Sequence, residues 1–499
     1  MTTSYLDNFY ARLGISQTAS LQDVQRAYRA AARKYHPDAN PSAGAQEIFL
    51  LVQEAYSVLG DQSRRAEYDL TLPPDINPPA DLMVNALYSR SQVTPGEAQQ
   101  VVYVMLDLMA AELLRGRRPP LNVSLVLDTS TSMAGSRLNQ VLKSAMQFIE
   151  ELEPQDTLSV VAFNDYAELV LPAQPVVNPQ LLRARLGALQ ARGGTEILQG
   201  LRAGLVEVRR NMRPNAVNHL LLVTDGRTYG DEAGSLQLAA QAAQLGVPIS
   251  VIGIGEEWNE AFVDQLAATA GGASLYADKS AQITQLVQRR LTGLNQVYAS
   301  NVKLHYQAGP GCRLDYAFRL APDGGMLQGE SPLFLGDIPL DGSLSVLLEF
   351  SVDARTFREG HVTLAEGDLR LDVPSRVIPA TKTRFELTRP VKSVAAPEAP
   401  PRALVGAIGK LSLYRMQERA REDLQNGDPQ AAAKRLRMLA TRLLSGGERG
   451  LARQVLNAAD EIKQGGSLGD KTGKQIKYGT RALVADFAAS GPLSEKETT

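Results

Sequence analysis

The hydrophobic pattern in the middle of the chain alternates between two periods. Short, nearly continuous apolar runs predict buried strands at Val123–Leu127, Leu158–Phe163, Leu220–Val223 and Ile249–Ile254. Between them, segments such as "SRLNQVLKSAMQFIEEL" and "GSLQLAAQAAQLG" place apolar residues at helical spacing. Apolar strands alternating with helices are typical of a doubly wound, Rossmann-like parallel sheet. We therefore expect an α/β domain that binds ligands at the carboxyl ends of its strands.

On both sides of this region the pattern changes to strict alternation. From Asn301 to Leu387, segments such as "LSVLLEFSV" predict antiparallel strands. The stretch from Leu82 to Ala110 is also strand-like. We expect these strands to form one β-sandwich into which the α/β domain is inserted.

The two ends of the chain are predicted to be helical. "LQDVQRAYRAAARKYHPDAN" and "AQEIFLLVQEAYSVLGD" predict an antiparallel helical hairpin, and helices return from Ala403 to about Val484. The proline-rich stretches "LPPDINPPA" and "VAAPEAPPRA" are typical of linkers. The fold class is therefore multidomain, α + α/β + β. The predicted boundaries are 1–71 (helical domain), 72–81 (linker), 82–120 (sandwich strands), 121–294 (α/β domain), 295–390 (remaining sandwich), 391–402 (linker), 403–488 (helical domain) and 489–499 (tail).

Composition narrows the class of protein. The 499 residues are 44% hydrophobic and 21% charged, as in an ordinary globular protein. The formal net charge is −2, so the chain as a whole has no positive electrostatic field that would attract nucleic acid or an anionic membrane. The four histidines are scattered and Cys312 is the only cysteine, which excludes a disulfide framework and Cys/His zinc sites. The N-terminus does not resemble a signal peptide, and no apolar run approaches the roughly 20 residues of a membrane helix. We expect a cytoplasmic protein.

Polar side chains gather where the predicted strands end. "LNVSLVLDTSTSM" delivers Asp128, Ser130 and Ser132 directly after a buried strand, "GGTEI" contains Thr195, and "LLLVTDGRT" ends another strand at Asp225. Carboxylates and hydroxyls are hard oxygen ligands, which favour Mg²⁺ or Mn²⁺ over zinc.

These five residues resemble the metal-ion-dependent adhesion site of von Willebrand factor A domains. The resemblance covers about Asn122 to Leu294 and includes the order of strands and helices. It implies a metal with one open coordination position, which an Asp or Glu of a partner protein completes. Alternatively, the hydroxyls cap the following helix and Asp225 begins a turn.

An enzymatic alternative is disfavoured by one residue. An aspartate after a first strand is the nucleophile of haloacid-dehalogenase-like phosphatases, which need a second aspartate two residues later as a general acid. Here that position is Ser130, which cannot serve as an acid at neutral pH. A metal-dependent phosphohydrolase is therefore a less favoured reading, and we expect no enzymatic activity.

The N-terminal helices enclose the tripeptide His36, Pro37 and Asp38. With "NFYARLGI" upstream, a basic helix before it and "EAYSVLGD" and "DQSRRAEYD" after it, the segment from Asn8 to Asp69 closely resembles the J domain of DnaJ-type co-chaperones. The resemblance implies docking on a DnaK-type heat-shock chaperone through the tripeptide and the basic residues Arg26, Arg29, Arg33 and Lys34. A full-length DnaJ also has a Gly/Phe-rich stretch and four zinc-binding cysteine repeats, and this chain has neither.

Other polar residues carry less information. His305, Cys312 and His361 are isolated and are interpreted as structural, and Lys434, Arg435, Arg437 and Arg442 as a solvated helix face. "KQIKYGTRALV" resembles the closing segment of bacterial proteins that combine an A domain with β strands and terminal helices.

The leading hypothesis is an adaptor that recruits and stimulates a DnaK-type chaperone and binds a partner protein through Mg²⁺. The alternative is a scaffold for complex assembly with a structural metal.

Overall fold

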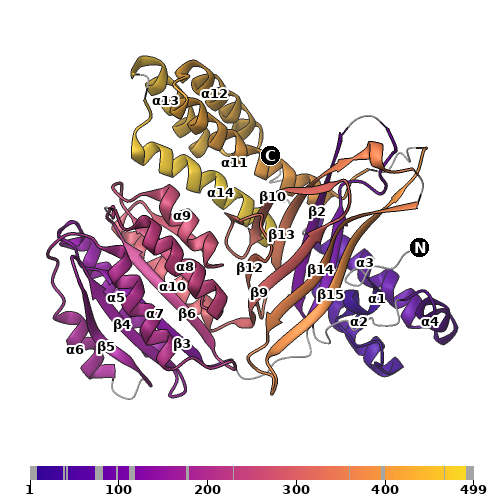
Figure 1. The fold of residues 1–499 in the computed structure, drawn as a ribbon, viewed down its shortest axis with the longest axis horizontal. Helices are drawn as coiled ribbons and strands as arrows, with labels where there is room; N and C mark the ends of the chain where they lie inside the picture. The colour runs from indigo at the N-terminus through magenta and orange to yellow at the C-terminus, as the bar shows by residue number, and fades with distance from the viewer. Residues whose placement is uncertain are drawn as a thin grey trace, which may run out of the picture. The chain divides into compact units, whose positions relative to one another are not determined.

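The computed structural model describes residues 8–37, 40, 43–72, 82–96, 99–111, 118–175, 179–228, 230–358, 360–394, 399–465 and 467–490 (Figure 1). The chain divides into two compact units. Unit 1 comprises Met1–Arg117, Val297–Ile408 and Ala485–Thr499, and unit 2 comprises Arg118–Gln296 and Gly409–Val484. The segment that begins unit 2 thus interrupts unit 1 in sequence, as expected for an inserted domain. Most of the first predicted linker and part of the second lie outside the described residues.

Unit 1 begins with four helices, which are α1 (Phe9–Leu13), α2 (Leu21–Tyr35), α3 (Ala43–Leu59) and α4 (Gln62–Asp69). A capping box between Ser20 and Asp23 starts α2, and the chain becomes extended at His36, directly before Pro37. Arg65 ties α4 to the loop before α2, because its guanidinium donates to the carbonyls of Gln17 at 2.9 Å and Ala19 at 2.8 Å. The predicted helical hairpin is confirmed.

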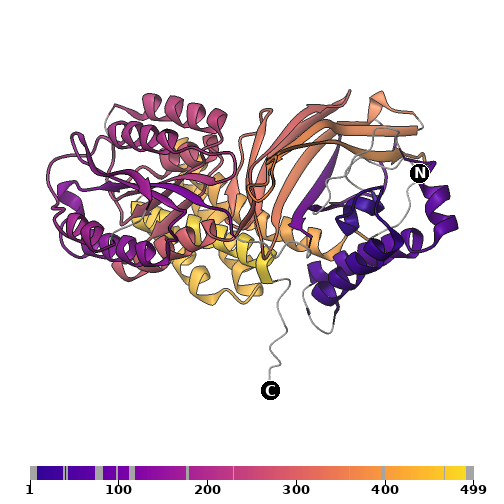
Figure 2. The same cartoon turned by 90° about the horizontal axis from the view of Figure 1, so that it is seen from below.

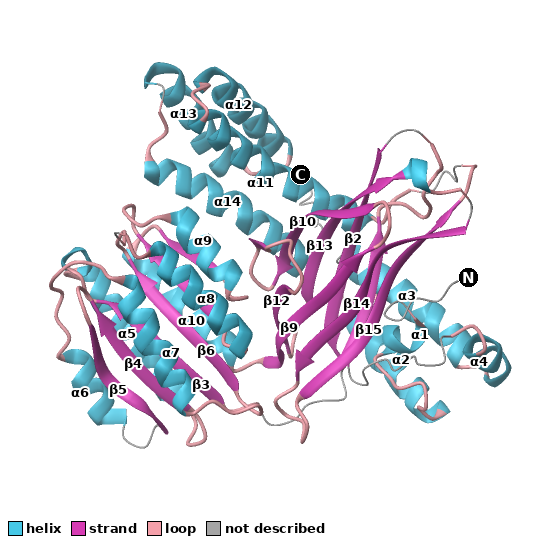
Figure 3. Cartoon of the chain, in the orientation of Figure 1, coloured by secondary structure: helices cyan, strands magenta, loops and turns pink. Residues whose placement is uncertain are grey.

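The strands of unit 1 form two antiparallel sheets (Figure 3). The five-stranded sheet has the order β1 (Leu82–Tyr88), β2 (Gln99–Ala110), β13 (Leu344–Asp353), β10 (Cys312–Ala321) and β11 (Gly325–Met326). The four-stranded sheet has the order β12 (Leu333–Pro339), β9 (Val297–Ala308), β14 (Gly360–Asp372) and β15 (Ala380–Val391). Because β2 pairs with β13, the stretch before the α/β domain joins strands that follow it. The prediction of an interrupted β domain is confirmed.

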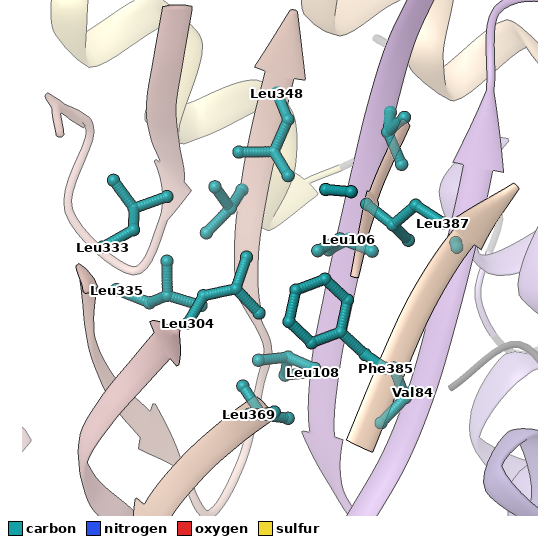
Figure 4. Close-up of a cluster of buried hydrophobic side chains, with 14 of the residues drawn as sticks. Val84, Leu106, Leu108, Leu304, Leu333, Leu335, Leu348, Leu369, Phe385 and Leu387 are labelled. Carbon is teal, nitrogen blue, oxygen red and sulfur yellow. The ribbon is translucent and has the colours of Figure 1, made fainter. Parts of the chain in front are cut away.

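The two sheets enclose one hydrophobic core (Figure 4). Phe385 of β15 lies among leucines and valines of both sheets, including Leu106, Leu304 and Val84. These side chains are almost completely removed from water. Burial on this scale is the main free-energy source of the sandwich, at roughly 25 cal/mol per Å² of apolar surface.

Unit 2 contains a six-stranded sheet of order β5 (Ala167–Pro175), β4 (Thr157–Phe163), β3 (Leu121–Asp128), β6 (Val217–Thr224), β7 (Ile249–Ile254) and β8 (Ser274–Ala277). Figure 2 shows helices on both faces of this sheet. The helices are α5 (Ser136–Glu151), α6 (Pro179–Gly187), α7 (Ile197–Arg210), α8 (Glu232–Leu245), α9 (Glu260–Thr269) and α10 (Ser280–Leu294). The four predicted strands are confirmed. The sheet differs from the predicted parallel one because the edge strand β5 runs antiparallel to β4.

The C-terminal part consists of the helices α11 (Arg402–Gln425), α12 (Pro429–Ser445), α13 (Arg449–Gly465) and α14 (Asp470–Ser490). Leu436 and Leu443 of α12 and Val455 and Ile462 of α13 share one apolar core. Asp428 caps α12, with a proline at its first turn. Among the helices that the structure describes, none is long and apolar enough to cross a membrane.

Within unit 2, α14 packs on the β8 edge of the α/β sheet. Tyr478 lies against Trp258 and Tyr276, with ring centroids 5.9 and 5.3 Å away. Lys477 and Arg481 form ion pairs with Asp264 of α9 at 2.7 and 3.1 Å. The C-terminal helices are therefore joined to the α/β domain by both apolar and charged contacts.

Candidate functional site

The predicted metal ligands lie at adjacent strand ends. β3 and β6 are parallel neighbours, with Leu127 opposite Val223, so Asp128 and Asp225 leave the sheet side by side. Both aspartates are completely buried. After β3 the chain passes through a short 3₁₀ turn, Thr131–Met133, which keeps the D-x-S-x-S loop compact.

Hydrogen bonds connect four of the five predicted ligands. The backbone N–H of Ser130 donates to Asp128 Oδ1 at 2.8 Å, and the Ser130 and Ser132 hydroxyl oxygens are 3.0 Å apart. The Ser132 hydroxyl donates to Asp225 Oδ1 at 2.6 Å. The two carboxylates are therefore linked through the two serines.

Thr195 reaches the same edge from the loop before α7. Gly226 follows Asp225, and a Cβ at this glycine would lie 2.6 Å from the Thr195 hydroxyl oxygen. The Thr131 N–H donates to the carbonyl of Gly193 at 3.1 Å, which holds the Thr195 loop against the D-x-S-x-S loop. The structure thus brings the three predicted loops together, with Thr195 placed beside the backbone that follows Asp225.

The electrostatics of the two aspartates favour a cation. Burial raises the pKa of Asp128, hydrogen bonds from Ser130 and Thr224 oppose the rise and the Asp225 carboxylate adds to it, with a net pKa of about 6. Two neighbouring buried carboxylates are unfavourable unless positive charge neutralises them. The side chains offered here are carboxylates and hydroxyls, which suit a hard divalent ion.

The described residues do not offer a metal site of another type. No group of three or more His, Cys, Asp or Glu side chains that could hold an ion occurs among them. A metal at the candidate site would therefore depend on two carboxylates, hydroxyls and water. Such a ligand set matches Mg²⁺ or Mn²⁺ better than a transition metal that prefers nitrogen or sulfur.

Two residues at the site were not predicted from the sequence. The Thr224 hydroxyl donates to Asp128 Oδ2 at 2.6 Å. Arg137 Nη1 donates to Asp225 Oδ2 at 2.5 Å and to the carbonyl of Ser132 at 3.2 Å. Arg137 lies in the first turn of α5, where a cation opposes the helix dipole, but this position in the sequence does not indicate which carboxylate it contacts.

The predicted chaperone-facing residues lie on one side of α2. Arg26, Arg29 and Arg33 are exposed, and their spacing of three and four residues places them on the same helix face. Lys34 is half-buried, with its ammonium 5.5 Å from the centre of the Tyr35 ring. The structure therefore presents three guanidinium groups together at the surface of the domain.

The tripeptide follows directly from this helix. His36 and Pro37 are exposed, and the imidazole of His36 lies edge-on to the ring of Phe49 on α3, with centroids 5.3 Å apart. Asp38 lies outside the described residues. The described part of the tripeptide is thus accessible at the end of the basic face.

The isolated histidines, the cysteine and the C-terminal basic residues lie in strands or on helix surfaces, as expected for structural or solvated side chains. His305 and Cys312 are half-buried in strands and His361 is exposed. Among the C-terminal basic residues, Arg435 pairs with Asp423 and Arg437 with Asp460, both on neighbouring helical segments. We assign no binding role to these residues.

Family models match three parts of the chain. A DnaJ domain matches residues 8–69, a von Willebrand factor type A domain residues 122–289, and an Sll0103-like C-terminal alpha-helical domain residues 402–486. The chain therefore contains a J domain and a von Willebrand factor A domain, followed by a helical domain of the Sll0103 type. The resemblances to a J domain and to a von Willebrand factor A domain are confirmed, and the metal-ion-dependent adhesion site within the A domain stays a prediction.

Similar proteins cover these parts unequally. The protein sll0103 of Synechocystis is 28% identical over 341 residues, which are 65% of this chain and 79% of that protein. The chaperone protein DnaJ of Streptococcus agalactiae is 52% identical over 61 residues, 12% of this chain, and the match spans only 16% of that chaperone. The relationship to DnaJ thus concerns the J domain alone.

Solved structures share the fold of most of the chain. A von Willebrand factor type A protein from Catenulispora acidiphila has a TM-score of 0.62 at 16% identity, over 80% of this chain and 96% of that one. The ArnB paralog VWA2 from Sulfolobus acidocaldarius has a TM-score of 0.54 at 16% identity, over 81% and 99%. At this identity the likeness establishes the fold alone.

Proposed function

We propose that this protein is a non-enzymatic adaptor. Its J domain recruits a DnaK-type heat-shock chaperone and stimulates ATP hydrolysis by it, and its A domain binds a partner protein through Mg²⁺ or Mn²⁺. The observation that supports this proposal is the occurrence of two candidate sites on one chain. One consists of the exposed arginines of α2 beside His36, and the other of the linked carboxylates and hydroxyls at the end of β3 and β6.

The charge of α2 supports the chaperone half. Arg26, Arg29 and Arg33 form an exposed positive face, which would attract an acidic surface and accelerate association, more strongly at low salt. His36 and Pro37 end this face, and a short polar contact there would fix the orientation of the bound chaperone.

The chemistry of the ligand set supports the metal half. Asp128, Ser130, Ser132, Thr195 and Asp225 would hold the ion, and a bound divalent cation would supply an open position for a carboxylate of the partner. Ser130 and Ser132 orient the aspartates through hydrogen bonds, which would hold the site ready for binding. Charge-assisted contacts of this kind give orientation, and the surrounding loops would give specificity.

Stimulated ATP hydrolysis tests the chaperone half. The steady-state ATPase rate of a DnaK-type chaperone is measured with the full chain, the His36→Gln variant and the matched control His361→Gln, which alters an exposed histidine of β14. We expect wild type and the control to stimulate the rate equally and His36→Gln to lose most of the stimulation. Equal stimulation by His36→Gln and wild type would remove the chaperone from the proposed function.

A further inference from the structure

Arg137 places a permanent positive charge inside the candidate metal centre. Its guanidinium contacts Asp225 Oδ2 at 2.5 Å and the carbonyl oxygen of Ser132 at 3.2 Å. Asp225 is completely buried, whereas the side chain of Arg137 is 35% exposed. The guanidinium is therefore open to solvent on one side, whereas the carboxylate is enclosed by the protein.

The position of Arg137 in its helix is intrinsically unfavourable. It is the second residue of α5, where the N–H groups of the first turn already produce a positive potential. A basic residue is tolerated at such a position when a carboxylate compensates it, and here Asp225 does so. The contact with Asp225, rather than any contribution to the stability of α5, therefore accounts for an arginine at this position.

The neighbouring backbone also accommodates the guanidinium. Gly255, after β7, has a φ of +72°, and a Cβ at this position would lie 2.9 Å from Arg137 Nη2. A larger residue would therefore displace the guanidinium. The absence of a side chain at Gly255 leaves the space in which Arg137 reaches Asp225.

Both oxygens of Asp225 have a donor. Oδ1 accepts from the Ser132 hydroxyl and Oδ2 from Arg137. A divalent ion that uses Asp225, directly or through water, would meet a guanidinium on the same carboxylate. Like charges at such short range in a partly buried site repel strongly.

We propose that Arg137 is an internal cation that competes with the divalent ion for Asp225 and thereby sets the metal affinity of the site. Arg137 neutralises the Asp225 carboxylate at low metal concentration, and a bound divalent ion would displace the guanidinium from this carboxylate. The role is one of positioning and affinity, since Arg137 does not itself contact the partner. This inference rests on the metal site put forward above.

Titration of the chelator-dialysed full chain with Mg²⁺ by calorimetry tests the competition. The variants are Arg137→Gln, which removes the charge, Arg137→Lys, which keeps it, and Arg202→Gln, which removes an exposed arginine of α7 as a matched control. We expect Arg137→Gln to bind Mg²⁺ at least about tenfold more tightly than wild type, and the control to bind like wild type. Arg137→Lys keeps the charge but replaces the planar guanidinium, which contacts both Asp225 and the Ser132 carbonyl, with a single ammonium, so it is expected to compete less well and to fall between wild type and Arg137→Gln.

Thermal unfolding gives a second readout. In chelator, Arg137→Gln should melt at a lower temperature than wild type, because Asp225 loses its counter-ion, and Mg²⁺ should raise its melting temperature more than it raises that of wild type. If Arg137→Gln does not fold, Arg137→Lys still decides the question, since it should bind Mg²⁺ more tightly than wild type.

The outcomes separate this inference from the metal site itself. Mg²⁺ binding by wild type with an unchanged affinity in both Arg137 variants would overturn the competition and leave the metal site in place. An absence of Mg²⁺ binding in wild type and in both Arg137 variants would overturn the metal site, and the competition with it.

Discussion

Asp128 links the metal site to the pH dependence of stability. Burial raises the pKa of its carboxyl from 3.8 to about 6. A carboxyl whose pKa is higher in the folded state favours folding at low pH, and this contribution is lost as pH rises from about 4 through about 6. The shift corresponds to a cost of about 3 kcal/mol at neutral pH. A bound divalent cation would oppose this cost by favouring the ionised carboxylate.

We therefore predict a pH effect that Asp128→Asn removes. In metal-free buffer, wild type should lose about 3 kcal/mol of unfolding free energy between pH 4 and pH 7 relative to Asp128→Asn. The measurement is urea denaturation of both proteins at several pH values. Parallel pH profiles for the two proteins would contradict the assigned ionisation of Asp128.

For individual residues, the sequence predicted the five candidate metal ligands but not all of the side chains that contact them. Asp128 and Asp225 could be placed because the ends of adjacent parallel strands meet at one sheet edge. Thr224 and Arg137 were missed, since their contacts depend on which rotamer points into the site. Such contacts have no periodic signature along the chain.

At the scale of elements, α14 is joined to the α/β domain by a charge cluster around Asp264. Desolvation alone would raise the pKa of Asp264, yet Lys477 and Arg481 lower it to about 2. The side chains of both cations are more than nine-tenths buried, whereas that of Asp264 is 22% exposed. The carboxylate therefore stabilises the folded state above about pH 4, and this contribution is lost as pH falls toward 2.

Removing the Asp264 carboxylate should lower the stability of unit 2. We predict that Asp264→Asn lowers the unfolding free energy of unit 2 by about 3 kcal/mol, because two buried cations lose their counter-ion. The control is Asp460→Asn, which breaks an exposed pair with Arg437 and should change stability by less than about 1 kcal/mol. Urea denaturation of the full chain measures both. Equal effects of the two substitutions would show that the Asp264 cluster behaves as an exposed ion pair.

The elements themselves differed in how well the sequence predicted them. β3, β6 and β7 are buried on both faces and contain nearly continuous apolar runs, so their pattern was clear. β5 lies at the sheet edge with most of its residues exposed or half-buried, so its weaker pattern did not reveal it. Buried positions require apolar residues, so a strand that is buried along its length has a recognisable apolar pattern in the sequence, and an exposed edge strand does not.

At the scale of the whole molecule, the J domain and the sandwich share a core within unit 1. The strand β1 and the part of β2 from Val104 to Ala110 are buried on both faces. Leu82 and Val84 point into the sandwich, whereas Met83 and Met109 belong to the core of the J-domain helices. The Tyr35 hydroxyl contacts the sulfur of Met109 at 2.9 Å. The sequence did not predict this contact, because the apolar pattern of β1 and β2 does not indicate which helices cover their outer face.

The shared core predicts that the sandwich stabilises the J domain. Met109→Asp should place a charge in this core and destabilise the J-domain helices by about 3 kcal/mol. Hydrogen exchange of the α1–α3 amides in the full chain measures the effect as lost protection. Met326→Asp, at a site that is 56% exposed, is the control and should leave the protection unchanged. Unchanged protection in Met109→Asp would mean that the J domain folds independently of the sandwich.

Capture of a protein partner by the A domain through a divalent metal is the main element of the proposed function. The most direct measurement is a lysate pull-down on the immobilised full chain, with Mg²⁺ or chelator, for wild type and Asp128→Ala. Asp341→Ala, at an exposed aspartate in the turn after β12, serves as the control. We predict a partner that binds wild type and the control in Mg²⁺ and is absent from chelator and from Asp128→Ala. An identical set of bound proteins under all conditions would contradict metal-dependent capture.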